Sequence, residues 1–218
     1  MEKMTRKEFM TNCWRFYLML EKRFLDTTQY VELHHENFST FSLEYVNLLQ
    51  SIGSELDVFM KVVCDFEQTD RKTIADYCPV ILQKYSCIKN QKVVINALDD
   101  SIKPFEEWRR ECPKQSLVWW NAYDLVKHGR IKNFDSANLE NVLNALAALY
   151  LLEMYYLKDI VKEDEMDIPD RESELFALDN WETRFISKNG LMLKVTGEDE
   201  FSFGVNGRVQ NIDGGELE

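Results

Sequence analysis

The segment from Ala137 to Val161 constrains the fold more than any other part of the chain. Its first half, A-N-L-E-N-V-L-N-A-L-A-A-L, is rich in strong helix formers. Between Val142 and Leu152 the residues are apolar on nearly every side of a helix. A helix of this kind needs several neighbours to bury it. The apolar run from Val142 to Leu152 is shorter than the ~20 apolar residues that a helix needs to cross a bilayer. We therefore expect this segment to be the central helix of a bundle. Its expected N-cap is Asp135 or Ser136.

Four further helices are predicted because apolar residues recur at three- and four-residue steps. They cover about residues 5–28, 40–66, 70–85 and 117–129. The first should bury Phe9, Cys13, Phe16, Tyr17, Leu20 and Phe24, and the second Leu43, Val46, Leu49, Ile52, Leu56, Phe59 and Val63. Ser39 or Thr40 is the expected N-cap of the second helix and Asp70 that of the third, which Pro79 should kink or split.

The predicted fold class is mainly α, a four- to five-helix bundle with a short β-like insertion and an acidic C-terminal appendage. The insertion is predicted within residues 91–112, where V-V-I-N precedes a turn. Residues 1–165 should form the bundle and residues 166–218 the extension. Within that extension, alternating runs around Asn189-Gly190 predict a β-hairpin near residues 184–195.

Charge and cysteine content narrow the class of protein. The net charge is −12 over 218 residues, and residues 161–218 hold 15 Asp/Glu against 6 Lys/Arg, so the bundle itself is close to neutral. This balance excludes a globally basic nucleic-acid-binding surface but allows a local basic patch. The five cysteines form no C-x-x-C pair, and no export signal or membrane span is visible. We expect a cytoplasmic protein that does not bind a membrane.

The most informative short stretch is W-W-N-A-Y-D-L-V-K-H-G-R, residues 119–130. At about 100° per residue, one side of a helix would carry Asn121, Asp124, Leu125 and His128, and the opposite side Trp119, Ala122, Tyr123 and Val126. The second set is the natural core face. Asp124 and His128 are then either an ordinary i, i+4 pair on a helix flank or the centre of a site that moves a proton near neutral pH.

Asn121, Asp124, Lys127 and His128, followed by the apolar helix that starts at Ala137, give the chain a resemblance to the HEPN superfamily of nucleotide-binding four-helix-bundle domains. The resemblance covers residues 1–160 in architecture, although its motif is short. In active members an arginine precedes a histidine by four to six residues, and two such motifs meet across a dimer to cut RNA without metal. The resemblance therefore implies a HEPN-like, RNA-directed bacterial protein, and a metal-independent endoribonuclease of stress or phage defence as its catalytic form.

The motif arginine is not matched in this chain. His128 matches the motif histidine, but Asn121 occupies the arginine position at the six-residue spacing. An amide lacks the positive charge and the paired N–H donors of a guanidinium. By the resemblance, the catalytic set would be His128, Asn121 and Asp124, with the last two orienting the imidazole. Lys127, Arg130 and Lys132 would bind RNA, and Lys127 and Arg130 would also steady the transferring phosphate. A nearby tyrosine or tryptophan could stack a base.

The competing hypothesis is a non-catalytic helical module that dimerises or docks a protein partner through the same surface. The two hypotheses together predict three candidate partners: single-stranded RNA, a second copy of the chain in a homodimer, or another protein. No cofactor is expected, because the common nucleotide-binding and hydrolase motifs are missing. No metal site is expected either, because His34 and His35 would point about 100° apart on a helix.

Overall fold

The structure is a computed structural model of the chain. It describes residues 3–98, 100–162, 165–181, 183–186, 192–195, 201–205 and 208–211, and from residue 184 onward it describes strand backbone only. Within this described part the protein is mainly α-helical with a short β insertion, as the sequence predicts. None of its helices combines the length and the apolar character needed to span a bilayer.

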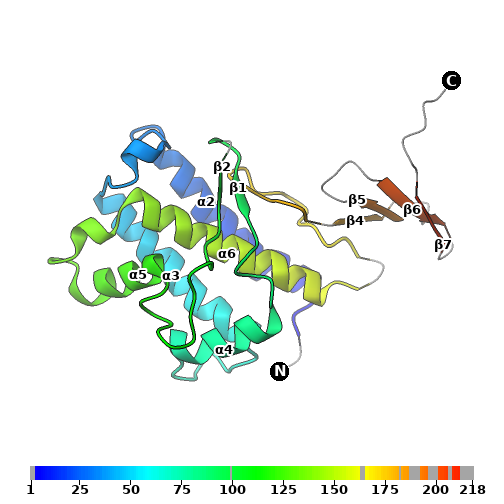
Figure 1. Ribbon diagram of the computed structural model, residues 1–218, viewed down its shortest axis with the longest axis horizontal. Coiled ribbons are helices and arrows are strands. Elements are labelled where there is room, and N and C mark those ends of the chain that lie inside the picture. The colour runs from blue at the N-terminus through cyan, green and yellow to red at the C-terminus, as the bar shows by residue number, and fades with distance from the viewer. Residues whose placement is uncertain are drawn as a thin grey trace.

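Five helical bodies make up the bundle in the described residues (Figure 1). The first is a continuous run in which α1 and α2 flank a π-helical turn, η1. The bounds are α1 Arg6–Phe9, η1 Met10–Trp14, α2 Arg15–Thr27, α3 Leu43–Val63, α4 Ile74–Lys84, α5 Val118–Gly129 and α6 Leu139–Ile160. Two 3-10 turns, η2 His35–Asn37 and η3 Phe134–Ser136, lie in the connections.

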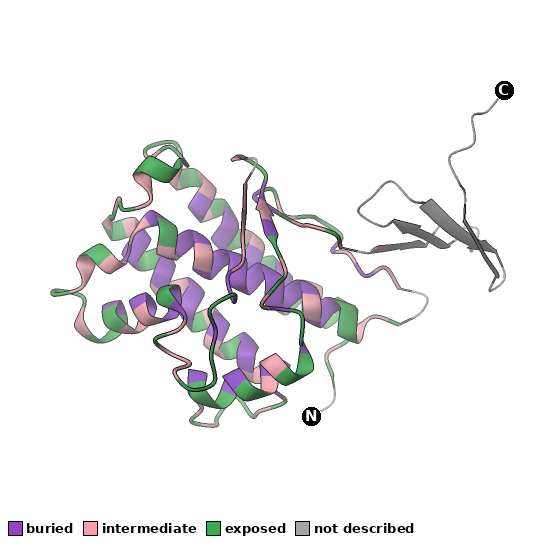
Figure 2. Cartoon of the chain, viewed as in Figure 1, coloured by how far each residue is buried: buried purple, intermediate pink, exposed green. Residues whose placement is uncertain are grey.

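Helix α6 is the centre of the fold. It contacts α2, α3, α5 and α1, and Figure 2 shows buried residues along most of its length. From Leu139 to Leu157 nearly every apolar side chain is buried, including Ala145, Ala147 and Ala148. The predicted central helix is therefore confirmed. Small alanines let neighbouring helices approach, while the leucines fill the space between them.

The helices begin later than predicted because other polar residues cap them. Ser42 caps α3, accepting a hydrogen bond from the Tyr45 amide at 3.1 Å, so neither Ser39 nor Thr40 is the cap. Thr73 and Asp76 form a reciprocal capping box on α4 in place of a cap at Asp70. Asn138 caps α6, accepting from the Asn141 amide at 3.0 Å, so Asp135 and Ser136 lie outside the helix. Helix α4 also accommodates Pro79 without splitting.

The π-helical turn η1 changes which residues of the first helix face the core. A π turn holds more residues than an α turn, so it rotates the side chains that follow it. Cys13 and Trp14 are both buried, whereas Phe16, predicted to be buried, has 38% of its surface exposed. Leu43, at the first position of α3, was also predicted to be buried and is exposed.

A three-stranded antiparallel sheet confirms the predicted insertion. Strands β1 (Val93–Ile95) and β2 (Asp100–Ile102) form a hairpin, and β3 (Phe176–Leu178) pairs with the other edge of β1. A second antiparallel sheet has the order β4 (Thr183–Ile186), β5 (Met192–Val195), β6 (Phe201–Val205) and β7 (Arg208–Asn211). Strands β4 and β5 pair on either side of the predicted hairpin turn, and the Asn189-Gly190 turn itself lies outside the described residues.

Residues 165–178 form a strap that is tied to the first helical body. Arg6 donates from Nε to the Met166 carbonyl at 3.0 Å, and Trp14 donates from Nε1 to the Arg171 carbonyl at 2.7 Å. The buried Glu21 carboxylate accepts from the Ser173 hydroxyl and from the backbone amides of the next two residues. The predicted boundary at residue 165 thus falls just before a segment that packs on the bundle.

Helices α3 and α5 meet at Gly53. A Cβ atom placed on Gly53 would lie 2.3 Å from Cδ2 of Tyr123, closer than any ordinary van der Waals contact. The nearest atoms belong to the buried aromatic ring of Tyr123, which cannot move away as the end of a flexible side chain can. Glycine at this position therefore sets the distance between the two helices.

The substitution Gly53→Ala should lower the free energy of unfolding by up to about 2 kcal/mol. Overpacking in a filled core costs about 1–3 kcal/mol, and the intrinsic preference of helices for alanine offsets about 1 kcal/mol of this cost. Urea denaturation measures the difference, and Ser54→Ala, on an exposed neighbour, is the control. A Gly53→Ala protein that is about 1 kcal/mol more stable than the wild type would show that the α3–α5 contact relaxes freely, because only the helix preference for alanine would then remain.

Candidate functional site

Helix α5 places its residues on the faces that helical spacing predicts. Trp119, Ala122, Tyr123 and Val126 are buried, Asn121 and Asp124 are half-buried, and Leu125 and His128 are exposed. The Trp119 indole donates from Nε1 to the Pro104 carbonyl at 2.8 Å, which anchors α5 to the segment that follows β2. The core face thus fixes the helix and leaves the Asp124–His128 side open to solvent.

The imidazole of His128 stands at the C-terminal end of α5. Its side chain is 69% exposed, and Nε2 lies 3.7 Å from Oδ1 of Asp124. The other carboxylate oxygen, Oδ2, accepts a hydrogen bond from Nζ of Lys114. Asp124 is therefore held between a lysine and the histidine, and at 3.7 Å the imidazole is near the carboxylate without a hydrogen bond to it.

Lys114 is a member of this cluster that the sequence did not reveal. It precedes Asp124 by ten positions and lies in the connection before α5, so no helical spacing links the two. Asn121, which the resemblance placed in the catalytic set, precedes His128 by seven residues. At 1.5 Å per residue the two lie about 10 Å apart along the helix axis, too far for Asn121 to orient the imidazole directly.

The three predicted RNA-binding cations differ in their contacts. Lys127 turns back on its own helix: its Nζ donates to the Tyr123 hydroxyl at 3.1 Å and lies 5.2 Å from the ring centroid. That hydrogen bond is the main reason why the pKa of Lys127 is raised. Arg130 and Lys132 are exposed, and within the described residues neither forms an ion pair. They are the cations with charge available to a ligand.

The aromatic residues of α5 do not offer a stacking surface. Trp119, Trp120 and Tyr123 are 4–6% exposed, so none of these three rings is open to a stacked base. The connection to α6 carries exposed apolar groups instead. Ile131 is 94% exposed, and Phe41, which is half exposed, meets Phe134 edge-on at a centroid distance of 5.6 Å.

The histidines of the other candidate cluster have separate partners. His34 accepts a hydrogen bond on Nδ1 from the Glu36 amide at 3.3 Å, and His35 places Nε2 3.2 Å from Oδ2 of Asp100. Over the part of the chain that the structure describes, no group of three or more His, Cys, Asp or Glu residues could hold a metal ion. The asparagines at the start of α6 also bond locally: Asn141 donates to the Ser136 carbonyl at 3.0 Å.

Comparison of the chain with protein-family models, with curated proteins and with solved structures finds no match. The end of α5 carries an open imidazole and a carboxylate fixed by a lysine, and the exposed connection that follows carries two cations without an ion pair among the described residues. Such a set can bind an anionic group and can exchange a proton with it.

A second unusual group lies inside the bundle. Glu153 of α6 is fully buried, and neither of its side-chain oxygens has a hydrogen-bond partner among the described residues. Burial, with a smaller contribution from the charge of Glu55, raises the pKa of Glu153 well above its usual range. Burial also raises the pKa of Glu55 on α3. Glu153 therefore holds a proton at a pH where an exposed glutamate has lost it.

This proton makes stability fall as the pH rises. Between the ordinary glutamate pKa of about 4.3 and the raised value, the folded state binds a proton that the unfolded state has released. The free energy of unfolding of the wild type, taken relative to Glu153→Gln, should therefore decrease above about pH 4.3, with a limiting slope of about 1.4 kcal/mol per pH unit.

Urea denaturation across this pH range measures the effect. The control is Glu32→Gln, at an exposed residue, whose stability should track the wild type at every pH. Parallel curves for the wild type and Glu153→Gln would mean that Glu153 ionises equally in both states, contrary to its burial.

Proposed function

We propose that this chain is a HEPN-like, RNA-directed protein that contacts the RNA backbone through the end of α5. The observation that carries the proposal is the open imidazole of His128, with Asp124 on the same helix face and the unpaired cations Arg130 and Lys132 just beyond it. Phosphate oxygens are the natural ligands of such cations, and phosphate contacts do not require a base-reading surface. The local charge is positive although the chain as a whole is acidic.

The catalytic form of the proposal is metal-independent cleavage of single-stranded RNA. His128 would take the proton of a ribose 2′-hydroxyl as that oxygen attacks the adjacent phosphorus. The bond to the 5′-oxygen then breaks, and an imidazolium, supplied by a second copy of the chain, would protonate that oxygen. Arg130 would stabilise the charge on the phosphorane, in the role that the missing motif arginine has in active members of the superfamily.

The second candidate function is a non-catalytic interaction module, and exposed apolar side chains favour it. Ile131 lies between the two unpaired cations and is almost fully exposed, and Leu125 on the outer face of α5 is 37% exposed. Contiguous exposed apolar patches often mark a surface that another protein covers, and these two side chains belong to the same end of α5 and the connection after it. A homodimer that meets at this end of α5 would bury them, and it would also bring two His128 side chains together.

Cleavage of a labelled single-stranded RNA in EDTA tests the proposal. We expect the wild type to cut, and His128→Ala to lose about 10²–10⁴-fold in rate, which is the usual contribution of a general acid or base. Arg130→Ala should weaken RNA binding and cleavage together. Arg15→Ala removes an exposed arginine of α2 and is the matched control, with activity expected at the wild-type level.

The outcomes separate the two functions. RNA binding without cleavage, lost in Arg130→Ala, would retain an RNA-directed role and exclude the nuclease. No binding and no cleavage, together with a dimer in analytical ultracentrifugation that Ile131→Asp dissociates, would favour the interaction module. Cleavage by His128→Ala at the wild-type rate would remove the histidine from any mechanism.

A further inference from the structure

Two connections that are far apart in the sequence are joined beyond the end of α5. They are the α2–α3 connection, residues 28–42, and the α5–α6 connection, residues 130–138. Phe41 of the first and Asn138 of the second form an isolated antiparallel β-bridge, and the first backbone amide of α6 donates to the Thr40 carbonyl at 2.9 Å. The fold therefore brings Phe41 to the connection that follows His128 and carries the cations of the candidate site.

The ring of Phe41 has a supported side and an open side. Phe134, from the α5–α6 connection, is partly buried and packs against the core of the bundle. Phe41 meets it at an interplanar angle of 89° and a centroid distance of 5.6 Å, yet 50% of Phe41 stays exposed. Phe41 thus differs from the three aromatic residues of α5, whose rings are closed to a ligand.

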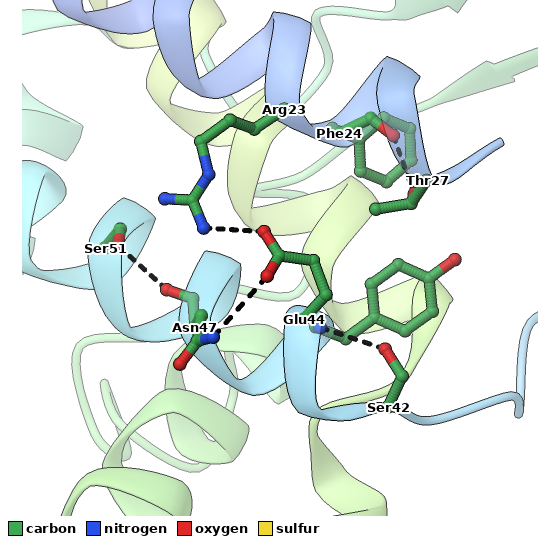
Figure 3. Close-up of polar contacts among 8 residues, drawn as sticks. Arg23, Phe24, Thr27, Ser42, Glu44, Asn47 and Ser51 are labelled. Atoms are coloured by element: carbon green, nitrogen blue, oxygen red, sulfur yellow. Dashed lines mark hydrogen bonds and ion pairs between the residues drawn. The ribbon is translucent and has the colours of Figure 1, made fainter. Parts of the chain in front are cut away.

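The backbone around Phe41 is fixed by the start of α3 (Figure 3). Ser42, the next residue, caps α3 and accepts a hydrogen bond from the Tyr45 amide at 3.1 Å. Arg23 of α2 donates from Nη2 to Oε1 of Glu44 at 2.6 Å, which ties the start of α3 to the preceding helix. A side chain that is already held in place loses little conformational entropy when it binds a ligand.

The cations of the α5–α6 connection lie close to this ring in the chain. Arg130 and Lys132 precede Phe134 by four and two residues, so the Cα atoms of Lys132 and Phe134 are at most about 7 Å apart. Asn133 fixes the turn, because its Nδ2 donates to the last carbonyl of α5 at 2.9 Å. The connection carries these two cations against one acid, Asp135, and is therefore net positive.

We infer that Phe41 stacks a base of the single-stranded RNA whose phosphates contact Arg130 and Lys132. The inference rests on the proposed RNA-directed function and adds to it a binding residue from a distant part of the chain. Proteins that hold single strands combine cations along the backbone with aromatic rings under the bases, and every base has a face that can stack. A ring of this kind requires unpaired bases, because paired bases in a duplex are already stacked on each other.

Fluorescence anisotropy with a labelled 2′-O-methyl hexaadenylate, and with the same hexamer lacking its bases, tests the inference. The methyl group removes the attacking hydroxyl, so binding is measured without cleavage. We expect the wild type to bind the hexaadenylate at least about fivefold more tightly than the abasic hexamer, which corresponds to about 1 kcal/mol, the lower end for one stacked base.

Substitutions at Phe41 separate stacking from simple packing. Phe41→Leu retains an apolar side chain against Phe134 but has no ring, so the preference for the hexaadenylate should disappear. Phe41→Trp should keep it. Phe16→Leu changes a phenylalanine of α2 that is 38% exposed and is the matched control, with the preference expected at the wild-type level. Circular dichroism checks that each variant is folded.

The outcomes distinguish this inference from the function on which it rests. A preference for the hexaadenylate that is unchanged in Phe41→Leu, or is absent in the wild type, would overturn the stacking role. Weaker binding of both hexamers by Arg130→Ala would in that case still support an RNA-directed protein. A wild type that binds neither hexamer would overturn the stacking role and the proposed function together.

Discussion

The structure depends on the burial of one helix on all sides. Helix α6 satisfies its own backbone hydrogen bonds, so apolar neighbours can surround it without leaving polar main-chain atoms unpaired. The first helical body, α3 and α5 each turn one apolar stripe toward it, and β3 covers part of what remains. Because the core lies around α6, each outer helix keeps one face free of it. The polar side chains of the bundle lie on these outer faces, apart from a few buried acidic residues.

Two buried glutamates, Glu21 and Glu153, differ in the number of hydrogen bonds that their carboxyl groups accept. Glu21 receives four donors: the hydroxyls of Tyr17 and Ser173 and the backbone amides of Glu174 and Leu175. It thereby fastens the strap of residues 165–178 to α2. Glu153 receives none from the described residues. One carboxyl group acts as a structural clamp, while the other keeps a proton because burial disfavours its charged form and no described residue donates to it.

The sequence periodicity correctly predicted the features that depend on one regular helix, above all which residues share a helix face. The faces of α5 follow from the 100° step, so Asp124 and His128 were correctly placed on one open side. The Lys114 partner of Asp124 comes from an irregular connection, and such contacts have no period to reveal them. Phe16 was misplaced because a π turn breaks the α-helical step. The caps shifted by two or three residues because several Ser, Thr, Asn and Asp residues competed for each helix start. The influence of Glu55 on Glu153 could not be predicted, because only the fold brings these parts of α3 and α6 near each other.

Helix α3 turns different faces to its neighbours. Gly53 faces α5, where an added Cβ atom would lie 2.3 Å from the Tyr123 ring, and Glu55 follows two residues later, about 200° around the helix. Glu55 and the helix that carries His128 therefore lie on different sides of α3. The same helix thus fixes the position of α5 through a residue without a side chain and, through Glu55, adds to the effect of burial that raises the pKa of the Glu153 carboxyl on α6.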